Sequence, residues 1–444
     1  MKKGSGVRGR GSEGGGRLET ASTSQLVRIE KPIYGGTFLA RVEGKAVFVP
    51  LALPGEQARV RVVEDKGSYA TAEMEELVVA APERVEPTCR HFGVCGGCQY
   101  QHAEYGAQLA FKLAILRETL ERGGVRAPEE IEVLAGEPWD YRNRIRLAVD
   151  ADGRVGYRGR RSHEVVEIAE CPIAAPVLVK AALAAGEFFR KFGRASRPME
   201  ISLFSDATGD SLLASIFTAG VAQVPLRDYF EALGQEIEQL KGVELVEMRR
   251  GQQPRRVAHA GSDSLTYRAA GFDYRVDHGA FFQVNRWLVD ELVECVTRGL
   301  SGGLAWDLFA GVGLFARLLA GKFGRVVAVE SAPAAMAALE QNLFGTGASA
   351  AKASTVEFLR RARRDARPDL IVVDPPRTGL GAETTALLGQ ISAPSLVYVS
   401  CDPATLARDL RALTGAGYAI EHITLADLFP QTFHLETVVR LRRQ

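Results

Sequence analysis

The chain has 444 residues and a formal net charge of +1, with 46% hydrophobic and 25% charged residues. This balance is ordinary for a globular protein and excludes a uniformly basic chain that attracts polyanions through its overall field. No apolar run approaches the roughly 20 residues that span a bilayer, and the basic N-terminus lacks the apolar segment of a secretory signal. We therefore expect a cytoplasmic protein without membrane contact, and a chain of this length predicts two or three domains.

The first 24 residues (1–24) have the composition of a disordered basic tail. Glycine and serine surround five basic residues and one acidic residue in the stretch Met1–Arg17. Such a segment cannot bury enough apolar surface to fold. Two interpretations remain open, a tail without function and an arm that contacts nucleic acid.

Residues 25–82 contain short strand patterns separated by glycine and proline turns. The expected strands are Leu26–Glu30, Phe38–Val42, Ala46–Val49, Ala58–Glu64 and Thr71–Val79. Five strands at this spacing predict a small barrel of the oligonucleotide-binding type. Nucleic-acid binding is one function of such a barrel, and any other small β-barrel is the alternative.

Residues 83–284 mix helical and strand patterns, which predicts an α+β central domain. Side chains alternate between apolar and polar in Trp139–Ile168, as in a half-buried strand. Helices are expected at Glu104–Gly123, Pro176–Phe192 and Leu226–Leu240, and further strands at Ile201–Phe204, Leu212–Phe217 and Val243–Arg249.

Residues 285–444 alternate between strands and helices. Helices are expected at Arg286–Gly299, Ala332–Phe344 and Ala404–Ala412. The expected strands are Leu304–Trp306, Arg325–Val329, Leu370–Val373, Leu396–Val399, Ala419–Leu425 and Thr437–Leu441. This order predicts an α/β domain with a doubly wound, Rossmann-like sheet that closes with an antiparallel hairpin.

Four of the six cysteines form a pattern typical of a metal site. Cys89, Cys95 and Cys98 are close in sequence, and Cys171, followed by a proline, supplies a distant fourth thiol. In a reducing cytoplasm, clustered cysteines indicate metal binding rather than disulfides. Four thiolates suit zinc or an iron–sulfur cluster. A triplet with one lone cysteine favours iron–sulfur, because zinc ribbons use two short pairs.

A glycine-rich loop, Asp307-Leu-Phe-Ala-Gly-Val-Gly313, follows the first strand of the expected sheet. With Glu330 further along the chain, this loop formally matches a dinucleotide-binding pattern. The carboxylate of Asp307, however, suits an electropositive ligand better than a pyrophosphate. S-adenosylmethionine carries a sulfonium cation and a ribose diol but no phosphate. The loop therefore favours this cofactor, with NAD as the alternative.

Two more chemically active residues lie just past strands of the same expected sheet. Asp374 precedes two prolines, and Cys401 begins a strand-to-helix turn. Ligands bind beyond the carboxyl ends of the strands in such sheets, so we expect loop, carboxylate and thiol to face one cleft. We also expect the helix N-terminus to lower the pKa of the Cys401 thiol. Cys295 lies on the apolar face of a helix and is expected in the core.

A thiol beside a methyl donor indicates methylation of a pyrimidine base. The C5 carbon of uracil or cytosine is too poor a nucleophile to attack the methyl group unaided. Addition of a thiolate at C6 produces an enolate whose C5 can attack, and a base must then remove the C5 proton. Thiol, carboxylate and methyl donor together are what this reaction requires.

At these motifs the chain resembles the RNA 5-methyluridine methyltransferases, which modify uridine in 23S ribosomal RNA or in transfer RNA. The likeness extends from Gln25 to the C-terminus and includes Tyr141-Arg-Asn-Arg144, Phe281-Phe-Gln-Val-Asn285, Ser400–Asp409 and His434-Leu-Glu436. It implies a class I S-adenosylmethionine-dependent methyltransferase domain and an N-terminal TRAM barrel. It also implies RNA as the partner of a monomeric enzyme.

The resemblance further implies roles for individual residues. Cys401 would be the nucleophile, Glu436 the base and Asp374 a second catalytic carboxylate. The implied cofactor contacts are Gln283, Phe309, Gly311, Gly313, Glu330 and Asp374. The implied ligands of a [4Fe-4S] cluster are Cys89, Cys95, Cys98 and Cys171.

The chain departs from the family pattern at a few positions. Asp402 stands where asparagine is frequent, which adds a negative charge beside the nucleophile, and Leu314 stands where asparagine or threonine is frequent. The acidic residue expected near Ser354-Thr355, which would contact the adenine of the cofactor, is either missing or displaced to Glu357. The turn that begins at Tyr34 is less rich in glycine than is common in TRAM barrels. None of these departures removes a catalytic group.

The sequence thus predicts a cytoplasmic enzyme that methylates C5 of uridine in RNA. The TRAM-like barrel favours 23S ribosomal RNA as substrate, and transfer RNA is the alternative. A non-catalytic iron–sulfur protein that binds RNA is the alternative from a different functional class.

Overall fold

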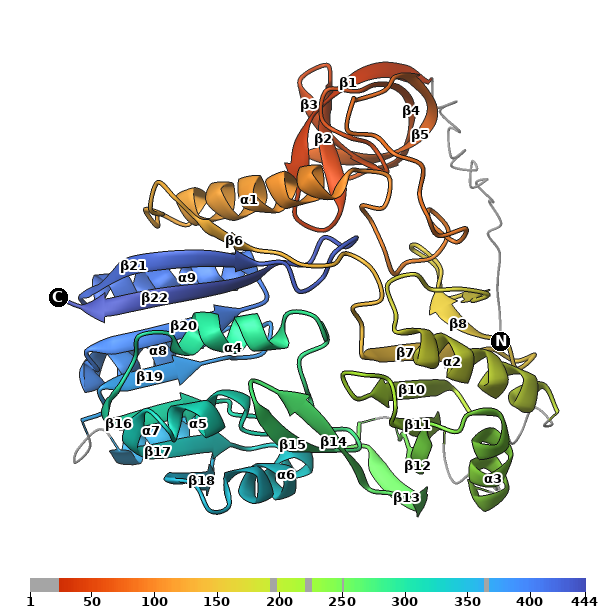
Figure 1. Cartoon of the computed structure of the whole chain (residues 1–444). Helices are drawn as coiled ribbons and strands as arrows, with labels where there is room; N and C mark the ends of the chain where they lie inside the picture. Colours follow the sequence, from red (N-terminus) through yellow and green to blue (C-terminus); the bar gives the residue numbers. More distant parts are fainter. Residues whose placement is uncertain (1–23, 192–197, 220–225, 250, 363–366) are drawn as a thin grey trace, which may run out of the picture.

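The computed structural model describes residues 24–191, 198–219, 226–249, 251–362 and 367–444 (Figure 1). Apart from residue 24, the expected N-terminal tail lies outside the described residues, as does the end of the helix expected at Pro176–Phe192. Among the described residues the strands form a closed barrel, a seven-stranded sheet, a two-stranded pair and an eight-stranded sheet. No helix in these ranges is long and apolar enough to cross a membrane.

The N-terminal strands close into the expected barrel, in the order β1-β2-β3-β5-β4. They are β1 (Gln25–Ile33), β2 (Thr37–Val42), β3 (Lys45–Pro50), β4 (Gln57–Asp65) and β5 (Tyr69–Val79). Alternate apolar residues such as Val27 and Ile29 point inward, which follows from the two-residue period of a strand. Tyr100, from the segment that follows the barrel, belongs to the same core.

The C-terminal part of the chain contains the eight-stranded sheet, in the order β18-β17-β16-β19-β20-β22-β21-β6. Its strands are β18 (Ala348–Lys352), β17 (Phe323–Glu330), β16 (Gly302–Leu308), β19 (Leu370–Val373), β20 (Ser395–Ser400), β22 (Glu436–Arg443), β21 (Tyr418–Ala426) and β6 (Glu132–Leu134). The first five strands in this order are parallel, and β22 runs antiparallel to both β20 and β21. The expected doubly wound sheet with a closing hairpin is confirmed.

Both faces of this sheet are covered by helices, which explains why its central strands are apolar throughout. In β19, Val372 packs into one core while Ile371 and Val373 pack into the other. The helices on the Val372 side are α4 (Val289–Thr297), α5 (Leu314–Leu319) and α6 (Pro333–Leu343). The helices on the opposite side are α1 (Tyr105–Arg122), α7 (Thr355–Ala362), α8 (Gly381–Ile391) and α9 (Pro403–Gly415).

The central part of the chain forms the seven-stranded sheet, in the order β13-β12-β11-β10-β7-β8-β9. Its strands are β13 (Arg255–Gly261), β12 (Leu240–Glu247), β11 (Leu212–Thr218), β10 (Glu200–Ser205), β7 (Arg144–Val149), β8 (Val155–Arg158) and β9 (Val165–Glu167). The helices α2 (Pro176–Arg190) and α3 (Leu226–Glu236) share a core with this sheet. The separate pair consists of β14 (Ser264–Ala269) and β15 (Phe272–Asp277).

Two elements from the range 83–284 pack against the catalytic sheet instead of the central one. The apolar side of α1, with Ile115, Leu116 and Leu120, joins the core that contains α8 and α9. The short strand β6 pairs in parallel with β21 and completes the edge of the eight-stranded sheet. The sequence analysis assigned both elements to the central domain. Because β6 has three residues, it is too short to carry a periodic signal.

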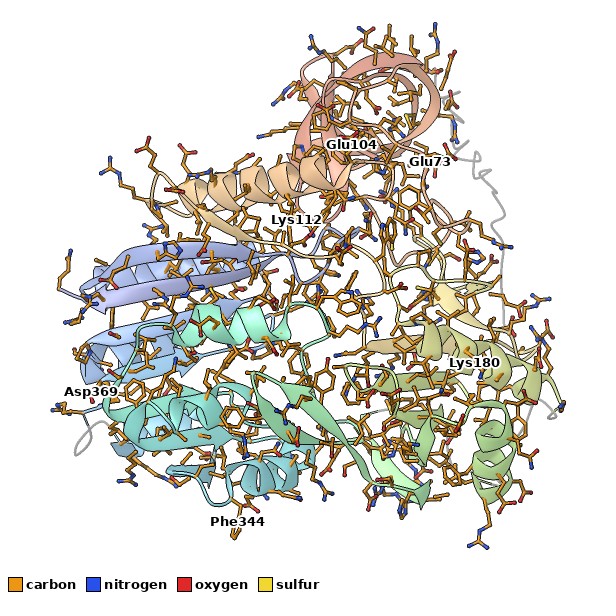
Figure 2. All side chains as sticks on the ribbon, viewed as in Figure 1. Glu73, Glu104, Lys112, Lys180, Phe344 and Asp369 are labelled. Atoms are coloured by element: carbon orange, nitrogen blue, oxygen red, sulfur yellow. The ribbon has the colours of Figure 1, made fainter. Side chains whose placement is uncertain are left out.

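A buried ion pair joins α1 to the end of β21. Lys112 Nζ lies 2.5 Å from Asp427 Oδ1, and both side chains are fully buried. Figure 2 shows Lys112 on the side of α1 that faces the catalytic sheet. A charge buried in this way must be paired, because an isolated one is strongly disfavoured in a low-dielectric interior. The pair therefore specifies where α1 sits on the sheet.

Candidate active site and cysteine cavity

The strand register brings the functional motifs to one edge of the catalytic sheet. Leu308, the last residue of β16, is paired with Val329 on one side and Val373 on the other. The residues that follow, Glu330 and Asp374, therefore flank the start of the glycine loop. The expectation that loop, carboxylate and thiol share one edge agrees with this arrangement, since Cys401 follows β20 at the same edge.

Glu436 reaches this edge because β22 is antiparallel to its neighbour. Ser400, the last residue of β20, pairs with Thr437, so the first residue of β22 lies beside the residue that follows β20. Glu436 is 5% exposed. Burial and the charge of Asp374 raise the pKa of the Glu436 carboxyl well above its usual range. Glu436 is thus a buried group facing the site and not a solvated strand end.

The glycine loop is tied to the carboxylate of Glu330. The backbone N–H of Gly311 donates to Glu330 Oε2 at 2.9 Å, while Oε1 accepts from the N–H groups of Ser331 and Ala332, each at 2.6 Å. The Glu330 side chain is therefore held in one orientation at the end of β17.

Backbone conformation in the loop requires particular residues. Gly313 has φ +90°, and a Cβ at this position would come within 2.8 Å of Leu339 Cδ1. Phe309 has φ +66°, which costs a non-glycine residue of order 1–3 kcal/mol. Strain of this kind persists where the surrounding structure imposes it, and it concentrates at ligand sites.

The edge of the sheet concentrates buried acidic groups. Asp307 is fully buried, and its Oδ2 accepts from the N–H of Ala316 at 2.9 Å. Its Oδ1 has no hydrogen-bond partner within the described residues. Burial, with the charges of Asp374 and Glu330, raises the pKa of Asp307 to about 8. Burial raises the pKa of Asp374 to about 7. Such a group of buried carboxyls suits a ligand that carries positive charge.

Gln283 connects the central segment to this pocket. Its Nε2 donates to Asp374 Oδ2 at 3.4 Å, and its own backbone carbonyl accepts from Asn143 Nδ2 at 2.8 Å. Asn143 is fully buried. The blocks at Tyr141–Arg144 and Phe281–Asn285 are thus in direct contact in the folded protein.

Cys401 does not have the lowered pKa that the sequence analysis expected. Burial in the first place, and then the charges of Glu436 and Asp374, raise the pKa of the thiol to about 12, while Arg377 acts in the opposite direction. Asp402 caps helix α9, with Oδ1 accepting from the N–H groups of Ala404 and Thr405. The prediction was wrong because desolvation and two carboxylates outweigh the helix N-terminus.

Arg377 and His434 are site residues to which the sequence analysis gave no role. Arg377 Nη2 donates to His434 Nδ1 at 2.9 Å. Burial and the positive charge of Arg377 lower the pKa of His434 to about 3, so the imidazole is neutral and can accept this bond. Both residues lie inside quoted motifs, at the end of Asp374–Arg377 and the start of His434–Glu436. Their place inside these motifs was the one feature of the sequence that could have indicated a role in the site.

The barrel reaches the active site through Tyr34, in the turn between β1 and β2. The Tyr34 hydroxyl donates to Asp402 Oδ2 at 3.4 Å, directly beside Cys401. The Tyr34 ring also packs edge-on against Phe433, with ring centroids 5.5 Å apart. The barrel turn therefore contacts both the nucleophile turn and the loop that precedes Glu436.

The loop 427–435, which leads into Glu436, is held by three other segments of the chain. Lys112 Nζ donates to one of its backbone carbonyls at 2.9 Å, the Tyr141 hydroxyl to a second at 3.0 Å and Asn285 Nδ2 to a third at 3.2 Å. The position of the Glu436 carboxyl thus depends on contacts that this loop makes with residues distant from it in the sequence.

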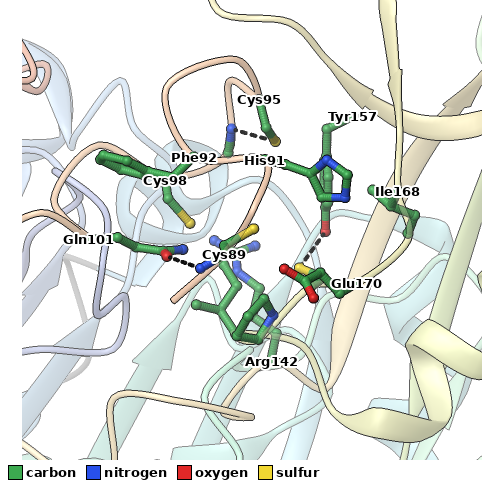
Figure 3. A pocket seen from close by; sticks show the side chains of 14 residues that line it. Cys89, His91, Phe92, Cys95, Cys98, Gln101, Arg142, Tyr157, Ile168 and Glu170 are labelled. Carbon is green, nitrogen blue, oxygen red and sulfur yellow. Dashed lines mark hydrogen bonds between the residues drawn. The ribbon is translucent and has the colours of Figure 1, made fainter. Parts of the chain in front are cut away.

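The four clustered cysteines surround a cavity of about 70 Å³, away from the strand edge. Figure 3 shows Cys89, Cys95 and Cys98 around it, with Arg142 and Tyr157 also in its lining. Cys171 lines the same cavity, and its Sγ lies 3.9 Å from the Tyr157 hydroxyl oxygen. Within the described residues, no group of three or more histidine, cysteine or acidic side chains is arranged to hold a metal ion.

Comparison with known proteins identifies the family. A profile described as tRNA (Uracil-5-)-methyltransferase matches residues 225–444, and a TRAM domain profile matches residues 22–74. A 23S rRNA (uracil(1939)-C(5))-methyltransferase of Halomonas elongata is 33% identical over 426 residues, which cover 92% of this chain and 87% of that protein. The chain belongs to the RNA uracil-C5 methyltransferase family. Enzymes of this family use S-adenosylmethionine, so the expected fold, family and enzyme class are confirmed.

Further similar proteins include another RNA methyltransferase and a solved structure of a uracil-C5 methyltransferase. An uncharacterized RNA methyltransferase of Streptomyces avermitilis is 35% identical over 438 residues, covering 94% of this chain and 97% of that protein. The structure of a tRNA (uracil-54, C5)-methyltransferase from Pyrococcus abyssi, in complex with S-adenosyl-L-homocysteine, matches with a TM-score of 0.74 and 25% identity. That match covers 94% of this chain and 100% of the other.

The electrostatics of the site predict how Cys401 reacts with a small alkylating agent. The thiolate is the reactive form, so alkylation by iodoacetamide should be slow at pH 7 and should accelerate about tenfold per pH unit. At alkaline pH, where Glu436 ionises, its charge raises the pKa of the Cys401 thiol, and Glu436→Gln removes that charge. This variant should therefore be alkylated faster than the wild type at a fixed pH, as measured by mass spectrometry of the peptide that contains Cys401.

Glu421→Gln, which changes an exposed carboxylate on β21, is the matched control and should leave the alkylation rate unchanged. Equal or slower alkylation of Cys401 in the Glu436→Gln variant would show that the two side chains are not electrostatically linked.

Proposed function

We propose that the protein transfers a methyl group from S-adenosylmethionine to C5 of a uridine in 23S ribosomal RNA, through a covalent adduct between Cys401 and C6. The observation that carries this proposal is the juxtaposition of Cys401 with a buried Glu436 at the same strand edge. The relative from Halomonas elongata, whose name specifies 23S rRNA, supports ribosomal RNA as the substrate.

Transfer RNA is the second candidate substrate. The Pyrococcus abyssi enzyme acts on a tRNA uracil and covers 94% of this chain. A methylation assay with unmodified 23S rRNA and tRNA transcripts in parallel distinguishes the two. A non-catalytic RNA-binding role is disfavoured by the retention of both Cys401 and Glu436 at one edge.

The cofactor would be held at the carboxyl ends of β16, β17 and β19. The proposed contacts are Gln283, Phe309, Gly311, Gly313, Glu330 and Asp374. When bound, S-adenosylmethionine supplies an electrophilic methyl group on a positively charged sulfur. The unpartnered oxygen of Asp307 and the nearby carboxylates fit a cation better than a pyrophosphate, which argues against NAD.

Cys401, Glu436 and Arg377 would divide the chemistry of the uracil ring between them. The Cys401 thiol first gives its proton to the Asp374 carboxylate, which leaves Glu436 free to act as the later base, and Arg377 stabilises the thiolate. Sγ then bonds to C6 of uracil, and the electron pair of the C5–C6 bond moves toward O4 as an enolate. C5 would then bond to the methyl carbon of the donor while the methyl–sulfur bond breaks, and the sulfur would keep the electron pair of that bond and become neutral. The Glu436 carboxylate removes the C5 proton, the C6–Sγ bond breaks, and the thiolate leaves.

The sequential roles of Cys401 and Glu436 give the sharpest test. Cys401→Ala should abolish both turnover and any covalent protein–RNA adduct. Glu436→Gln should also stop turnover, but after methyl transfer, because the C5 proton stays in place and the thioether cannot leave. This variant should accumulate methylated RNA joined to the protein, detected as a denaturant-resistant band that carries label from the methyl donor.

Cys295→Ala is the matched control, because Cys295 packs against the core below α4 and should not affect turnover. Normal turnover of the Glu436→Gln variant, or a dead variant that forms no adduct with a verified substrate, contradicts the assignment of Glu436 as the base. Asp374 would then be the next candidate.

Cys89, Cys95, Cys98 and Cys171 are proposed to hold a [4Fe-4S] cluster. Four thiols around a cavity, rather than around a point, suit a polynuclear cluster better than a single zinc ion. Arg142 adds a positive charge to the same lining. The cluster would tie Cys171 to the segment 89–98, more than 70 residues earlier in the chain.

The protein purified without oxygen should therefore be brown and contain iron. Replacement of Cys95 or Cys171 by serine should remove both the colour and the iron, and should lower the melting temperature. Cys295→Ser is the control that should keep both. Stoichiometric zinc without iron, measured by elemental analysis of the anaerobic preparation, contradicts the proposal.

The domain division at 25–82, 83–284 and 285–444, the cytoplasmic location and the monomeric state remain predictions. The packing of α1 and β6 on the catalytic sheet argues for moving the segment 105–134 from the central to the catalytic unit.

A further inference from the structure

An open hollow of about 380 Å³ lies beside the turn between β8 and β9. It is lined by Gly96, Gly97, Tyr157, Arg158, Gly159, Arg160 and Arg161. This lining contains three arginines and no carboxylate. Figure 1 shows β8 on the side of the central sheet that lies nearest to the barrel. The hollow is therefore a basic surface whose lining includes none of the residues at the strand edge that carries Cys401.

The arginine turn is fixed to the loop of the clustered cysteines by backbone hydrogen bonds. The N–H of Arg160 donates to the carbonyl of Val94 at 2.8 Å, and the N–H of Gly96 donates to the carbonyl of Arg158 at 3.0 Å. The two backbones approach so closely that a Cβ on Gly96 would lie 2.9 Å from this Arg158 carbonyl oxygen. The arginines are thus presented by a well-defined turn.

The positive charges of this turn are poorly compensated. Arg158 lies 3.9 Å from Glu200, a carboxylate that Arg146 approaches to 2.5 Å. Arg160 donates from Nε to the carbonyl of Gly93 at 3.2 Å, while its Nη1 is buried without a partner. Arg158 also donates to the carbonyl of His163 at 3.1 Å. Within the described part of the chain, the exposed Arg161 side chain has no such partner.

Arg161 also has an unusual backbone conformation, with φ +57°. Left-handed backbone is unfavourable for arginine, and residues held in this way are frequent at ligand sites. The conformation places an exposed, uncompensated guanidinium next to that of Arg160. Burial and the charge of Arg161 lower the pKa of Arg160, while the carboxylate of Glu73 acts in the opposite direction and compensates part of the charge.

The hollow shares a wall with the cysteine cavity. Gly97 and Tyr157 line both spaces. The Tyr157 hydroxyl faces Cys171 in the cavity, at 3.9 Å from its sulfur. Whatever the cysteines hold therefore also supports the wall on which the arginines are presented.

We infer that the hollow binds a backbone phosphate of the RNA substrate, and that the cysteine loop keeps it in shape. Guanidinium groups offer paired N–H donors that match phosphate oxygens. Contacts to phosphates position an RNA on a protein without reading its sequence. This inference rests on the proposed function in one respect, since the partner is the RNA that the enzyme methylates.

The test uses the full-length protein with unmodified 23S rRNA transcript, and compares the wild type with Arg161→Ala, Arg161→Lys and Arg160→Ala/Arg161→Ala. RNA affinity measured over a range of KCl concentrations should fall about tenfold for Arg161→Ala and further for the double variant. The slope of log affinity against log salt should become shallower by about one unit for each arginine removed. Arg161→Lys should keep the salt slope and lose part of the affinity, because lysine binds phosphate as a point charge.

In the methylation assay, KM for RNA should rise in the same variants while kcat and S-adenosylmethionine affinity stay unchanged. Arg325→Ala is the matched control, because this exposed arginine lies near the start of β17, at the opposite end of the strand from Glu330. It should not alter KM or the salt slope. Metal content equal to that of the wild type shows that the cysteine loop is intact.

Unchanged RNA affinity and salt slope in Arg161→Ala, in an enzyme whose wild type methylates the transcript, contradict the inference and leave the proposed function standing. Failure of the wild type to methylate any RNA is a different result and contradicts the proposed function. If the double variant unfolds, the single variants Arg161→Ala and Arg161→Lys give the answer, because the exposed Arg161 side chain has no hydrogen-bond or ion-pair partner among the described residues.

Discussion

Concentration of negative charge at one buried sheet edge is the constraint on which this site depends. Asp307, Glu330 and Asp374 lie at or directly after the carboxyl ends of three parallel strands, and the antiparallel β22 brings Glu436 to the same edge. Burial raises the pKa values of several of these groups and of Cys401. The resting site therefore holds protons. A cationic ligand stabilises the ionised carboxylates. Negative charge on these carboxylates disfavours ionisation of the Cys401 thiol, so the thiolate forms more readily once that charge is neutralised.

The segments outside the catalytic sheet act on this edge by fixing its loops. Lys112, Tyr141 and Asn285 hold the backbone of the loop that leads into Glu436. Tyr34 of the barrel contacts Asp402 beside the nucleophile. The barrel, α1 and the central segment are thus in contact with the turns that carry the two residues proposed to perform the chemistry. This connection explains why residues distant in sequence are needed to complete one small site.

Much of the fold could be predicted from the sequence, because strand runs and turn residues are local signals. The barrel strands, the parallel sheet and the strand-end positions of Asp374 and Cys401 follow from such signals. Strands β13 to β15 were not predicted, since β13 is largely exposed and lacks an apolar face. The packing of α1 and β6 on the catalytic sheet depends on non-local contacts. The pKa of the Cys401 thiol was predicted to be lowered, but it is raised. The sequence shows the helix N-terminus but not the burial of the thiol or the neighbouring carboxylates.

The most direct test of whether buried carboxylates select the cationic cofactor is the number of protons released when the cofactor binds. This number is measured by titration calorimetry at pH 7.5 in buffers of different ionisation enthalpy. Because the sulfonium cation favours ionised Asp307 and Asp374, binding of S-adenosylmethionine should release more protons than binding of S-adenosylhomocysteine, whose sulfur is neutral. The difference should shrink in Asp307→Asn. Equal proton release for the two ligands in the wild type would contradict an account in which buried carboxylates select the cationic cofactor.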